Sequence, residues 1–429
     1  MGFYNTDNWP EKSEYYRWPW SSNDNPVQWL EITDLCNIHC KGCYRSHMEG
    51  HRPLEVLEEE VGFCIKNRNI DTVCIAGGEP LIHPDIIKLV QYISDRRLKA
   101  NIITNTQAMT EKLVGELLEA GIYGFTCHID MVQERPNQPK ASSELELMPK
   151  RQQIADLIYK VGKGKIYVTF NMTVYHENFK YIPDIVSWAH KNVEKVSGLD
   201  FVTYRGIPLG KNVTWDVEQE RGAADLSRTF GYTDNYQQID ITSVDVYNII
   251  KDHLGSVFEP CAYLGGTGDV RQYKWWGQAF IIERDGRIHG SIGPRFMELL
   301  QIGHHWFTGR YFMYLRKNRA PRIVILLTAL IGDKKMRNAR WSILKGLINP
   351  LTWFRQVRFQ SIGINQPPDM LENGMACMCE SCPDACVWKG NLVSSCRLDE
   401  YRRFGKLMSA IVHEDERESA KEALVADRA

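Results

Sequence analysis

The chain lacks segments that would direct it into or across a membrane. Its first residues contain no basic stretch followed by an apolar one, so they do not resemble a secretory signal peptide. Its most apolar run, residues 323–331, is far shorter than the ~20 residues that a helix needs to span a bilayer. A net charge of −1 excludes a global electrostatic preference for nucleic acid. Together with 43% hydrophobic residues, these absences predict a globular, cytoplasmic protein.

The chain also lacks the character of a disulfide scaffold. Twelve cysteines in 429 residues are too sparse for one, because such scaffolds are short secreted chains. The cysteines gather instead in residues 36–43 and 377–396. Clustered thiolates in a reducing compartment favour soft metals, above all iron–sulfur clusters and zinc. The isolated Cys64, Cys74 and Cys127 are typical of small buried hydrophobes.

The first cysteine group follows an expected buried strand at residues 27–33. Cys36, Cys40 and Cys43 have the spacing CxxxCxxC within one short loop. A complete cube-shaped iron–sulfur cluster takes four cysteines. Three cysteines therefore predict a cluster with one iron open to a small molecule. For this motif alone, a zinc knuckle is the alternative.

A glycine-rich motif follows the next expected strand, residues 71–76. It consists of Gly77, Gly78, Glu79 and Pro80. In this order, the two motifs resemble those of the radical S-adenosylmethionine (SAM) enzymes. The resemblance implies a [4Fe-4S] cluster on the three cysteines, with SAM bound to its open iron and the amino group of SAM held by the Gly-Gly-Glu-Pro motif. One departure is Gly42, where the family commonly has an aromatic residue; Tyr44 is the candidate adenine contact.

Strands and helices alternate from residue 27 to about residue 215, which predicts an α/β fold with a parallel sheet. The expected strands are 27–33, 71–76, 99–104, 123–129, 166–174 and 199–205, and the expected helices are 54–68, 84–97, 110–120, 148–162 and 180–194. The family resemblance implies that these repeats form a partial, six-stranded (βα)6 TIM-type barrel. In such barrels the chemistry takes place at the C-terminal ends of the strands.

Polar residues at those strand ends are the next candidates. The resemblance implies that strand-end residues contact SAM, and the candidates are Asn105, Asn171, Thr173 and Arg205. His128 and Asp130 are candidate catalytic residues that face the substrate, since a histidine can transfer a proton near neutral pH. The alternative for all six is that they satisfy one another or neighbouring loops as buried polar groups.

A second cysteine group surrounds an expected β-hairpin at residues 275–288. Its members are Cys261, Cys377, Cys379, Cys382, Cys386 and Cys396. The order of cysteine, hairpin and cysteine cluster resembles the SPASM/twitch auxiliary domains, although Ser291 stands about where those domains have a further cysteine. The resemblance implies one auxiliary iron–sulfur cluster, with a second, incompletely ligated one left open. The preferred ligands are Cys261, Cys379, Cys382 and Cys386, with Cys377 and Cys396 as competitors; a zinc site is the alternative.

These features predict the domain organisation. We expect an N-terminal arm (1–26) laid over the barrel, the radical SAM partial barrel (27–215), a linker with a helix (216–260), a smaller Cys-rich α+β auxiliary domain (261–400) and a helical tail (401–429). Within the auxiliary domain, residues 296–360 form a helical insertion rich in basic and aromatic residues. Such composition is typical of a membrane-surface element. A solvated basic face packed on the barrel is the alternative; nucleic acid is disfavoured, because no RNA-binding motif accompanies it.

Three functional hypotheses remain open. The first is a radical SAM enzyme that modifies an unactivated carbon of a membrane-derived lipid or isoprenoid, at the inner membrane face. The second is a peptide-maturing or sugar- or aminocyclitol-oxidising enzyme with a SPASM-type domain. The third is a non-catalytic iron–sulfur or zinc protein. Either enzyme would also need a reducing partner, such as a flavodoxin- or ferredoxin-like electron donor.

Overall fold

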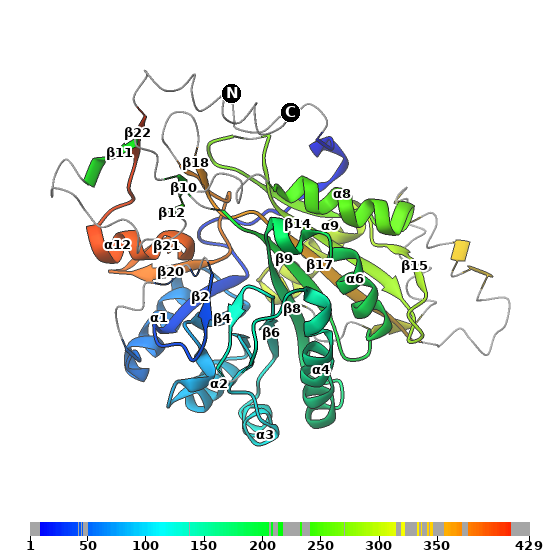
Figure 1. The fold of residues 1–429 in the computed structure, drawn as a ribbon, viewed down its shortest axis with the longest axis horizontal. Helices are drawn as coiled ribbons and strands as arrows, with labels where there is room; N and C mark the ends of the chain where they lie inside the picture. Colours follow the sequence, from blue (N-terminus) through cyan, green and yellow to red (C-terminus); the bar gives the residue numbers. More distant parts are fainter. Residues whose placement is uncertain are drawn as a thin grey trace.

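A large twisted sheet with helices outside it dominates the molecule (Figure 1). The computed structural model describes residues 9–41, 43, 45, 50–136, 138–205, 207–208, 213–217, 232–233, 241–269, 271–314, 319–321, 333, 336, 341–342, 344–345, 356–370 and 376–412. Of the predicted site residues, Tyr44 lies outside these ranges, as does most of the expected basic insertion.

Six parallel strands form the predicted partial barrel. In sheet order they are β2 (Val27–Thr33), β4 (Thr72–Gly77), β5 (Lys99–Thr104), β6 (Gly124–His128), β8 (Tyr167–Val174) and β9 (Gly198–Thr203). Neighbours in this order pair in parallel, so their C-terminal ends meet at one edge. This arrangement confirms the predicted α/β class, and each strand lies within two residues of its expected bounds.

The helices between these strands pack on the outside of the sheet. They are α1 (Leu54–Asn67), α2 (Ile86–Asp95), α3 (Glu111–Glu119), α4 (Met148–Gly162), α5 (His176–Phe179) and α6 (Ile182–Lys191). In α2, Ile86, Leu89, Val90 and Ile93 recur at helical spacing and are buried. Amphipathic helices of this kind bury one face on the sheet and leave the strand ends free to form a site.

The sheet continues beyond the barrel into the predicted auxiliary region. Strand β17 (Gln356–Asn365) pairs in parallel with β9 and antiparallel with β14 (Tyr273–Ile282). Strand β14 forms the expected hairpin with β15 (Ile288–Ser291) and also pairs with β13 (Ala262–Gly265); β16 (Arg319–Pro321) pairs with β17. Helix α8 (Ser243–Leu254), expected in the linker, contacts β14 (Figure 1). The barrel and the auxiliary region therefore share one continuous sheet.

The N-terminal arm lies along the auxiliary edge of this sheet and also contacts the barrel, where the Asn25 N–H donates to the Arg68 carbonyl and Arg68 donates to the Ser22 carbonyl at 3.0 Å. After the short helix η1 (Lys12–Glu14), β1 (Tyr16–Arg17) pairs in parallel with β13. Trp18 stacks on Trp20 with ring centroids 4.9 Å apart, and a Cβ on Gly277 would collide with the Trp18 ring. The pairing of β1 with β13 was not part of the expectation; the edge of β13 offers backbone groups with which β1 pairs.

The C-terminal segments return to the first barrel strand. β18 (Asp369–Met370) pairs with β19 (Ala376–Cys377), and β20 (Ala385–Trp388) pairs with β21 (Asn391–Ser394); η9 (Ser395–Arg397) and α12 (Leu398–Phe404) follow. The β20–β21 hairpin lies beside β2 and α1 (Figure 1). The expected helical tail needs correction, because residues 410–412 form strand β22 (Ala410–Val412), paired with β11 (Val213–Trp215). Their sequence, Ala-Ile-Val, favours a strand.

Two short strand pairs and one further helix complete the described strands and α-helices. The short strands β3 (His39–Cys40) and β7 (Gln133–Glu134) pair with each other, as do β10 (Ile207–Pro208) and β12 (Tyr232–Thr233). Helix α9 (Pro294–Thr308) begins the expected insertion. No helix within the described ranges has the length and apolar character needed to cross a bilayer.

Candidate active site

A cavity of about 650 Å³ lies at the C-terminal ends of the barrel strands. Its wall combines the first cysteine loop, the glycine pair, and side chains from β5, β6, β8 and β9. On the other side, β14, β17, α9 and the second cysteine group close it. The cavity therefore brings together the first cysteine group and three members of the second, Cys379, Cys382 and Cys396, which lie more than three hundred residues further along the chain.

The first cysteine loop has all three of its thiols in the cavity wall. Cys36 and Cys40 are partly buried and Cys43 is exposed. The backbone N–H of Cys43 donates to the carbonyl of Cys40 at 3.3 Å, and β3 pairs with β7. Burial raises the pKa of Cys36 and of Cys40 above the usual range. These thiols would ionise on binding iron, because a metal stabilises the thiolate.

The three cysteine side chains are not arranged around a single point in the structure. In the ranges that the structure covers, no three His, Cys, Asp or Glu side chains are placed to hold a single metal ion. The four cysteines of a cubane cluster each bind a different iron, so they need not meet at one point. Three thiols around a common space have the donor chemistry that fits such a cluster with one open iron.

The glycine pair lies against the backbone that carries the cysteines. Gly77 has a φ of +133°, and a Cβ there would overlap the Thr33 carbonyl oxygen. A Cβ on Gly78 would overlap the Leu35 carbonyl oxygen. The N–H of Gly78 donates to Thr33 at 2.7 Å, and that of Glu79 to Leu35 at 2.8 Å. Close backbone approach therefore requires glycine at both positions.

Glu79 lies beneath the cavity, where its carboxylate organises the neighbouring strand ends. It is fully buried and accepts hydrogen bonds from Leu81 N at 3.0 Å, Thr104 Oγ1 at 2.7 Å and Asn105 N at 2.7 Å. Burial raises its pKa. Asn105, held in this way, directs its side-chain amide to Cys36 Sγ at 3.5 Å. Pro80 is buried and begins the short helix η2 (Pro80–Ile82).

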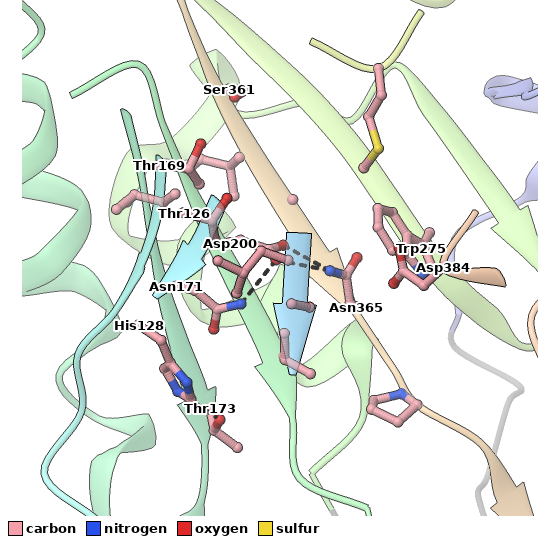
Figure 2. Close-up of a pocket in the computed structure, with 18 of the residues that line it drawn as sticks. Thr126, His128, Thr169, Asn171, Thr173, Asp200, Trp275, Ser361, Asn365 and Asp384 are labelled. Carbon is pink, nitrogen blue, oxygen red and sulfur yellow. Dashed lines mark hydrogen bonds between the residues drawn. The ribbon is translucent and has the colours of Figure 1, made fainter. Parts of the chain in front are cut away.

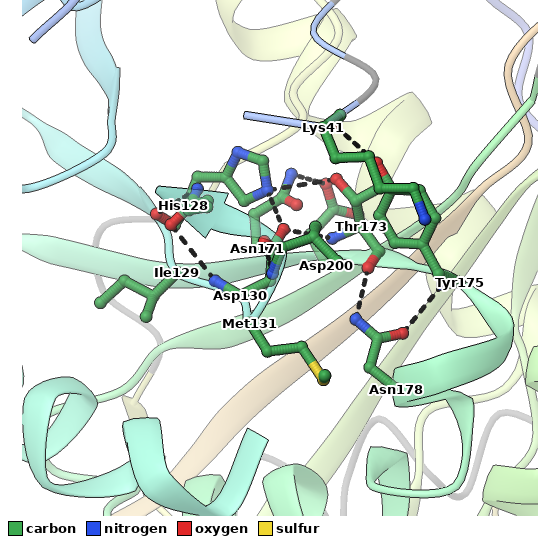
Figure 3. A network of polar contacts seen from close by, with 12 residues as sticks. Lys41, His128, Ile129, Asp130, Met131, Asn171, Thr173, Tyr175, Asn178 and Asp200 are labelled. Carbon is green, nitrogen blue, oxygen red and sulfur yellow. Dashed lines mark hydrogen bonds and ion pairs between the residues drawn. The ribbon is translucent and has the colours of Figure 1, made fainter. Parts of the chain in front are cut away.

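His128 and Asp130, the predicted catalytic pair, line the cavity but are engaged with each other. His128 Nε2 lies 2.7 Å from Asp130 Oδ2 and 3.1 Å from Thr173 Oγ1 (Figure 3). Asp130 Oδ1 also accepts from the N–H of Val132 at 3.2 Å. The same network reaches the cysteine loop, since Tyr175 donates its hydroxyl to the Lys41 carbonyl at 2.7 Å (Figure 3). This arrangement favours a bracing role, which was the alternative left open.

Two predicted SAM contacts also have protein partners. Asn171 donates its amide to Asp200 Oδ2 at 3.3 Å (Figure 2). Arg205 forms an ion pair with Asp369, whose Oδ1 lies 2.7 Å from the arginine Nε, and Lys274 pairs with the same carboxylate. Their role toward SAM stays a prediction.

Asp200 is the site residue that the sequence analysis missed. It lies on β9 in the cavity wall, and Asn365 Nδ2 on β17 donates to its two oxygens at 2.8 and 3.1 Å (Figure 2). Burial raises its pKa to about 7. An aspartate between Leu199 and Phe201 in an apolar strand was a visible signal. Its partner Asn365 comes from a strand that the sequence did not connect with the barrel.

The second cysteine group divides between the cavity and the surrounding core. Cys379, Cys382 and Cys396 line the cavity, whereas Cys261, Cys377 and Cys386 are buried outside its lining. A hydrogen bond with Cys379 lowers the pKa of Cys382 to about 7. Cys386 packs against Val393 and Leu398, and Cys261 donates its thiol to the Gly277 carbonyl at 3.2 Å. The structure thus favours Cys396 over the preferred Cys261 and Cys386 as a companion of Cys379 and Cys382.

A buried arginine connects the two cysteine groups. Arg45, two residues after Cys43, pairs with Glu31 on β2 and with Asp399 on α12 at 3.0 Å. It also donates to the carbonyl of Ser395 at 3.2 Å, next to Cys396. Because such a charge is costly to bury unpaired, this contact fixes how the loop meets the C-terminal segments.

Comparison with known proteins identifies the barrel. Residues 30–189 match the model of the Radical SAM superfamily. This segment of the chain is similar to the radical SAM enzymes. The matched residues contain all three cysteines of the first group and the Gly-Gly-Glu-Pro motif, which confirms the resemblance that the sequence indicated. The match implies a [4Fe-4S] cluster and SAM as cofactors, and the three thiols in the cavity wall have the donor chemistry that fits the cluster.

Each curated relative matches only part of this chain, and only part of the relative is matched. A probable GTP 3′,8-cyclase of Methanocaldococcus jannaschii is 24% identical over 170 residues, covering 37% of this chain and 53% of the relative. A tungsten-containing aldehyde ferredoxin oxidoreductase cofactor-modifying protein of Pyrococcus furiosus is 24% identical over 166 residues, covering 37% and 47%. The chain thus spans about half the length of these relatives. Among solved structures, Streptococcus suis SuiB has a TM-score of 0.39 at 16% identity, covering 54% of this chain and 47% of that one.

Proposed function

We propose that this protein is a radical SAM enzyme that cleaves SAM reductively and modifies an unactivated carbon of a membrane-derived lipid or isoprenoid. The observation that carries the first part is the shared cavity. Cys36, Cys40, Cys43 and the glycine pair face one space at the C-terminal ends of the barrel strands. Ligands of such barrels bind at this end.

The chain's own residues would hold and shield the cofactors. The three cysteines would hold a [4Fe-4S] cluster, and Gly77 and Gly78 line the cavity where SAM would bind beside it. When bound, these groups supply a 5′-deoxyadenosyl radical by one-electron cleavage of SAM. Asn105 orients Cys36, and Tyr175 fixes the backbone of the cysteine loop. Cys379, Cys382 and Cys396 would hold an auxiliary cluster on the opposite wall.

The apolar wall of the cavity supports a lipid or isoprenoid substrate. Phe296, Met297 and Leu300 of α9 line it, and Phe312 and Phe359 add to the same wall. Aliphatic and aromatic walls of this kind bind hydrocarbon chains through the hydrophobic effect.

The outer face of the same helix supports contact with a membrane. Leu299, Ile302 and Trp306 recur at helical spacing, and Trp306 is 82% exposed. Phe307 at the end of the helix is 85% exposed. Exposed aromatic and aliphatic groups next to a basic segment, which residues 310–358 supply in the sequence, are typical of an interfacial helix. Helix α9 would thus join the membrane surface to the cavity.

A nucleoside triphosphate, the type of substrate that the name of one relative indicates, fits this cavity poorly. Among the described lining residues the lysine and arginine side chains are those of Lys41 and Arg205. Each already faces a carboxylate, Glu177 at 3.1 Å and Asp369 at 2.7 Å. A triphosphate requires several cationic or backbone donors, and the Asp200 carboxylate, when ionised, would repel it.

Anaerobic reconstitution with iron and sulfide tests the radical SAM activity. Under a strong reductant, we expect the protein to produce 5′-deoxyadenosine from SAM, and we expect Cys36→Ala to abolish this. Cys64→Ala is the matched control, since Cys64 is buried within α1 away from the site. Production by Cys36→Ala at the control rate, or none by the wild type with a fully loaded cluster, would refute the proposal.

Liposome flotation at low salt tests the membrane contact. The protein should float with anionic vesicles, and Trp306→Ser combined with Phe307→Ser should reduce the bound fraction at least fivefold, because exposed aromatic area is lost. Leu407→Ser, an exposed apolar position outside α9, is the control. Equal flotation of the double variant and the control would exclude this surface.

A further inference from the structure

A carboxyl group stands among amide and hydroxyl side chains in one part of the cavity wall. Asp200 projects from β9, with Asn171 of β8 on one side and Asn365 of β17 on the other (Figure 2). Thr126, Thr169 and Ser361 lie around them (Figure 2). We call Asp200, Asn171 and Asn365 the carboxyl site.

We propose that Asp200 is the polar anchor of an amphipathic substrate, accepting a hydrogen bond from a hydroxyl or ammonium group at the end of a hydrocarbon chain. This proposal rests on the proposed function and names its substrate class. The hydrocarbon would lie against Phe296, Leu300 and Phe359, which are apolar lining residues.

The local packing is built around the carboxylate. Gly363, the neighbour of Asp200 in the register of β17 with β9, would place a Cβ 2.6 Å from Asp200 Oδ1. Any larger residue would displace the carboxylate. Asn365, two residues further on the same face of the strand, donates to both carboxylate oxygens. On β17, Gly363 thus leaves room for the Asp200 carboxylate and Asn365 orients it.

Both asparagines leave the anchor able to accept a further donor. Each donates its amide to Asp200, and the amide oxygens of both have no hydrogen-bond partner within the described residues. A carboxylate offers about four acceptor positions, more than the three contacts from these two side chains occupy. A substrate hydroxyl or ammonium would occupy a position left open.

The charged side chains around the cavity determine which charge the polar end of the substrate can carry. Asp130 and Asp200 line the cavity as carboxylates, whereas its lysine and arginine side chains, among the described residues, are paired with carboxylates. Burial raises the pKa of Asp384, a third lining carboxyl, well above its ordinary value, so that group is not counted as a charge. An anionic head group would meet repulsion, and a cation would meet attraction, in a space where burial weakens solvent screening. The polar end is therefore a donor and not a phosphate or carboxylate.

The protonation of Asp200 gives the anchor a measurable signature. Burial raises its pKa to about 7, while His128 lowers it. Other titratable groups that interact with it are Asp384, Tyr314, Tyr167 and Cys74. A long-chain amine stays protonated between pH 6 and pH 8, whereas Asp200 becomes ionised across that range. Binding of the amine should therefore strengthen as pH rises from 6 to 8.

Binding of three twelve-carbon probes to the full chain tests the proposal. Dodecylamine, 1-dodecanol and dodecyl phosphate differ only in the polar end, and calorimetry measures each without SAM or reductant. We expect dodecylamine and 1-dodecanol to bind more tightly than dodecyl phosphate at pH 8. Asp200→Asn should weaken dodecylamine about tenfold or more and flatten its pH dependence, because a charged acceptor becomes a neutral amide. Asp156→Asn on the exposed face of α4 is the control.

Two results of these titrations would contradict the role of Asp200. Tighter binding of dodecyl phosphate, or the same dodecylamine affinity and pH profile in Asp200→Asn as in the control, would overturn it. If Asp200→Asn does not fold, Gly363→Ala serves as the second variant, and it should weaken dodecylamine while Gly303→Ala, with open space around its Cβ, should not. Because these titrations need no SAM cleavage, loss of 5′-deoxyadenosine production would count against the proposed function and leave the anchor intact.

Discussion

The backbone of Gly78 lies so close to the carbonyl oxygen of Leu35 that no side chain fits between them. The glycine pair and the cysteine loop are therefore a single structural unit, although one follows β4 and the other follows β2. Hydrogen bonds from Gly78 and Glu79 to Thr33 and Leu35 hold this unit together. The spacing of Cys36 from the glycine pair thus depends on backbone contact as much as on side chains.

Gly78→Ala should disturb this unit. The new methyl group would force the Leu35 carbonyl away, so the loop that carries Cys36 would shift. We expect iron bound per chain after reconstitution to fall at least twofold, with a lower Tm. Gly62→Ala, on an exposed turn of α1 with no atom near its Cβ, should leave iron unchanged and slightly stabilise the protein. Equal iron content in the two variants would show that the close approach does not matter for the cluster.

Arg45→Met should destabilise the whole protein. Removal of the arginine leaves the carboxylates of Glu31 and Asp399 buried without this partner. Loss of one partner of a buried ion pair costs about 3–5 kcal/mol. Chemical denaturation measures this loss. Arg284→Met, at an arginine that is 78% exposed and paired with Glu194, should cost less than about 1 kcal/mol. An equally small loss of unfolding free energy in both variants would show that the ion pairs of Arg45 with Glu31 and Asp399 contribute little to stability.

Asp200 should make the protein less stable as pH rises toward neutrality. Its pKa in the folded state is about 7, above the ordinary value of 3.8, so the folded state binds more protons than the unfolded state between these values. The free energy of unfolding therefore falls as pH rises from 4 to 7, by about 4 kcal/mol at most. Denaturation at pH 5 and pH 8 should show a smaller fall for Asp200→Asn than for Asp156→Asn. Parallel curves for the two variants would contradict the raised pKa.

The barrel could be predicted from the sequence because its evidence is local. Each strand is an apolar run, and helices such as α2 show a clear apolar face next to it. The cysteine loop and the glycine pair were found for the same reason, since each follows a strand whose end is fixed by the fold. Asn105, at the end of β5, was likewise found from its position and contacts Cys36.

The remaining site depends on contacts between distant segments, which periodicity does not encode. Asn365 reaches Asp200 only because β17 joins the barrel sheet beside β9. The pairing of the N-terminal arm with the auxiliary region was missed for a similar reason, because β1 pairs with β13, more than two hundred residues away. Arg205 lies two residues beyond the end of β9, and its partner Asp369 was not visible from the sequence.

The cysteines of the second group occupy different environments in the structure, which their spacing in the sequence did not reveal. Cys396 lines the cavity with Cys379 and Cys382, whereas Cys386 packs in a small core with Val393. Cys396→Ala should therefore lose about four irons per chain after reconstitution, the content of one cubane cluster. Cys386→Ala should keep them and lose only stability, by about 1 kcal/mol, because a small buried side chain is shortened. Iron analysis and EPR of the two folded variants measure the difference; loss of the auxiliary signal in Cys386→Ala alone would reverse the assignment.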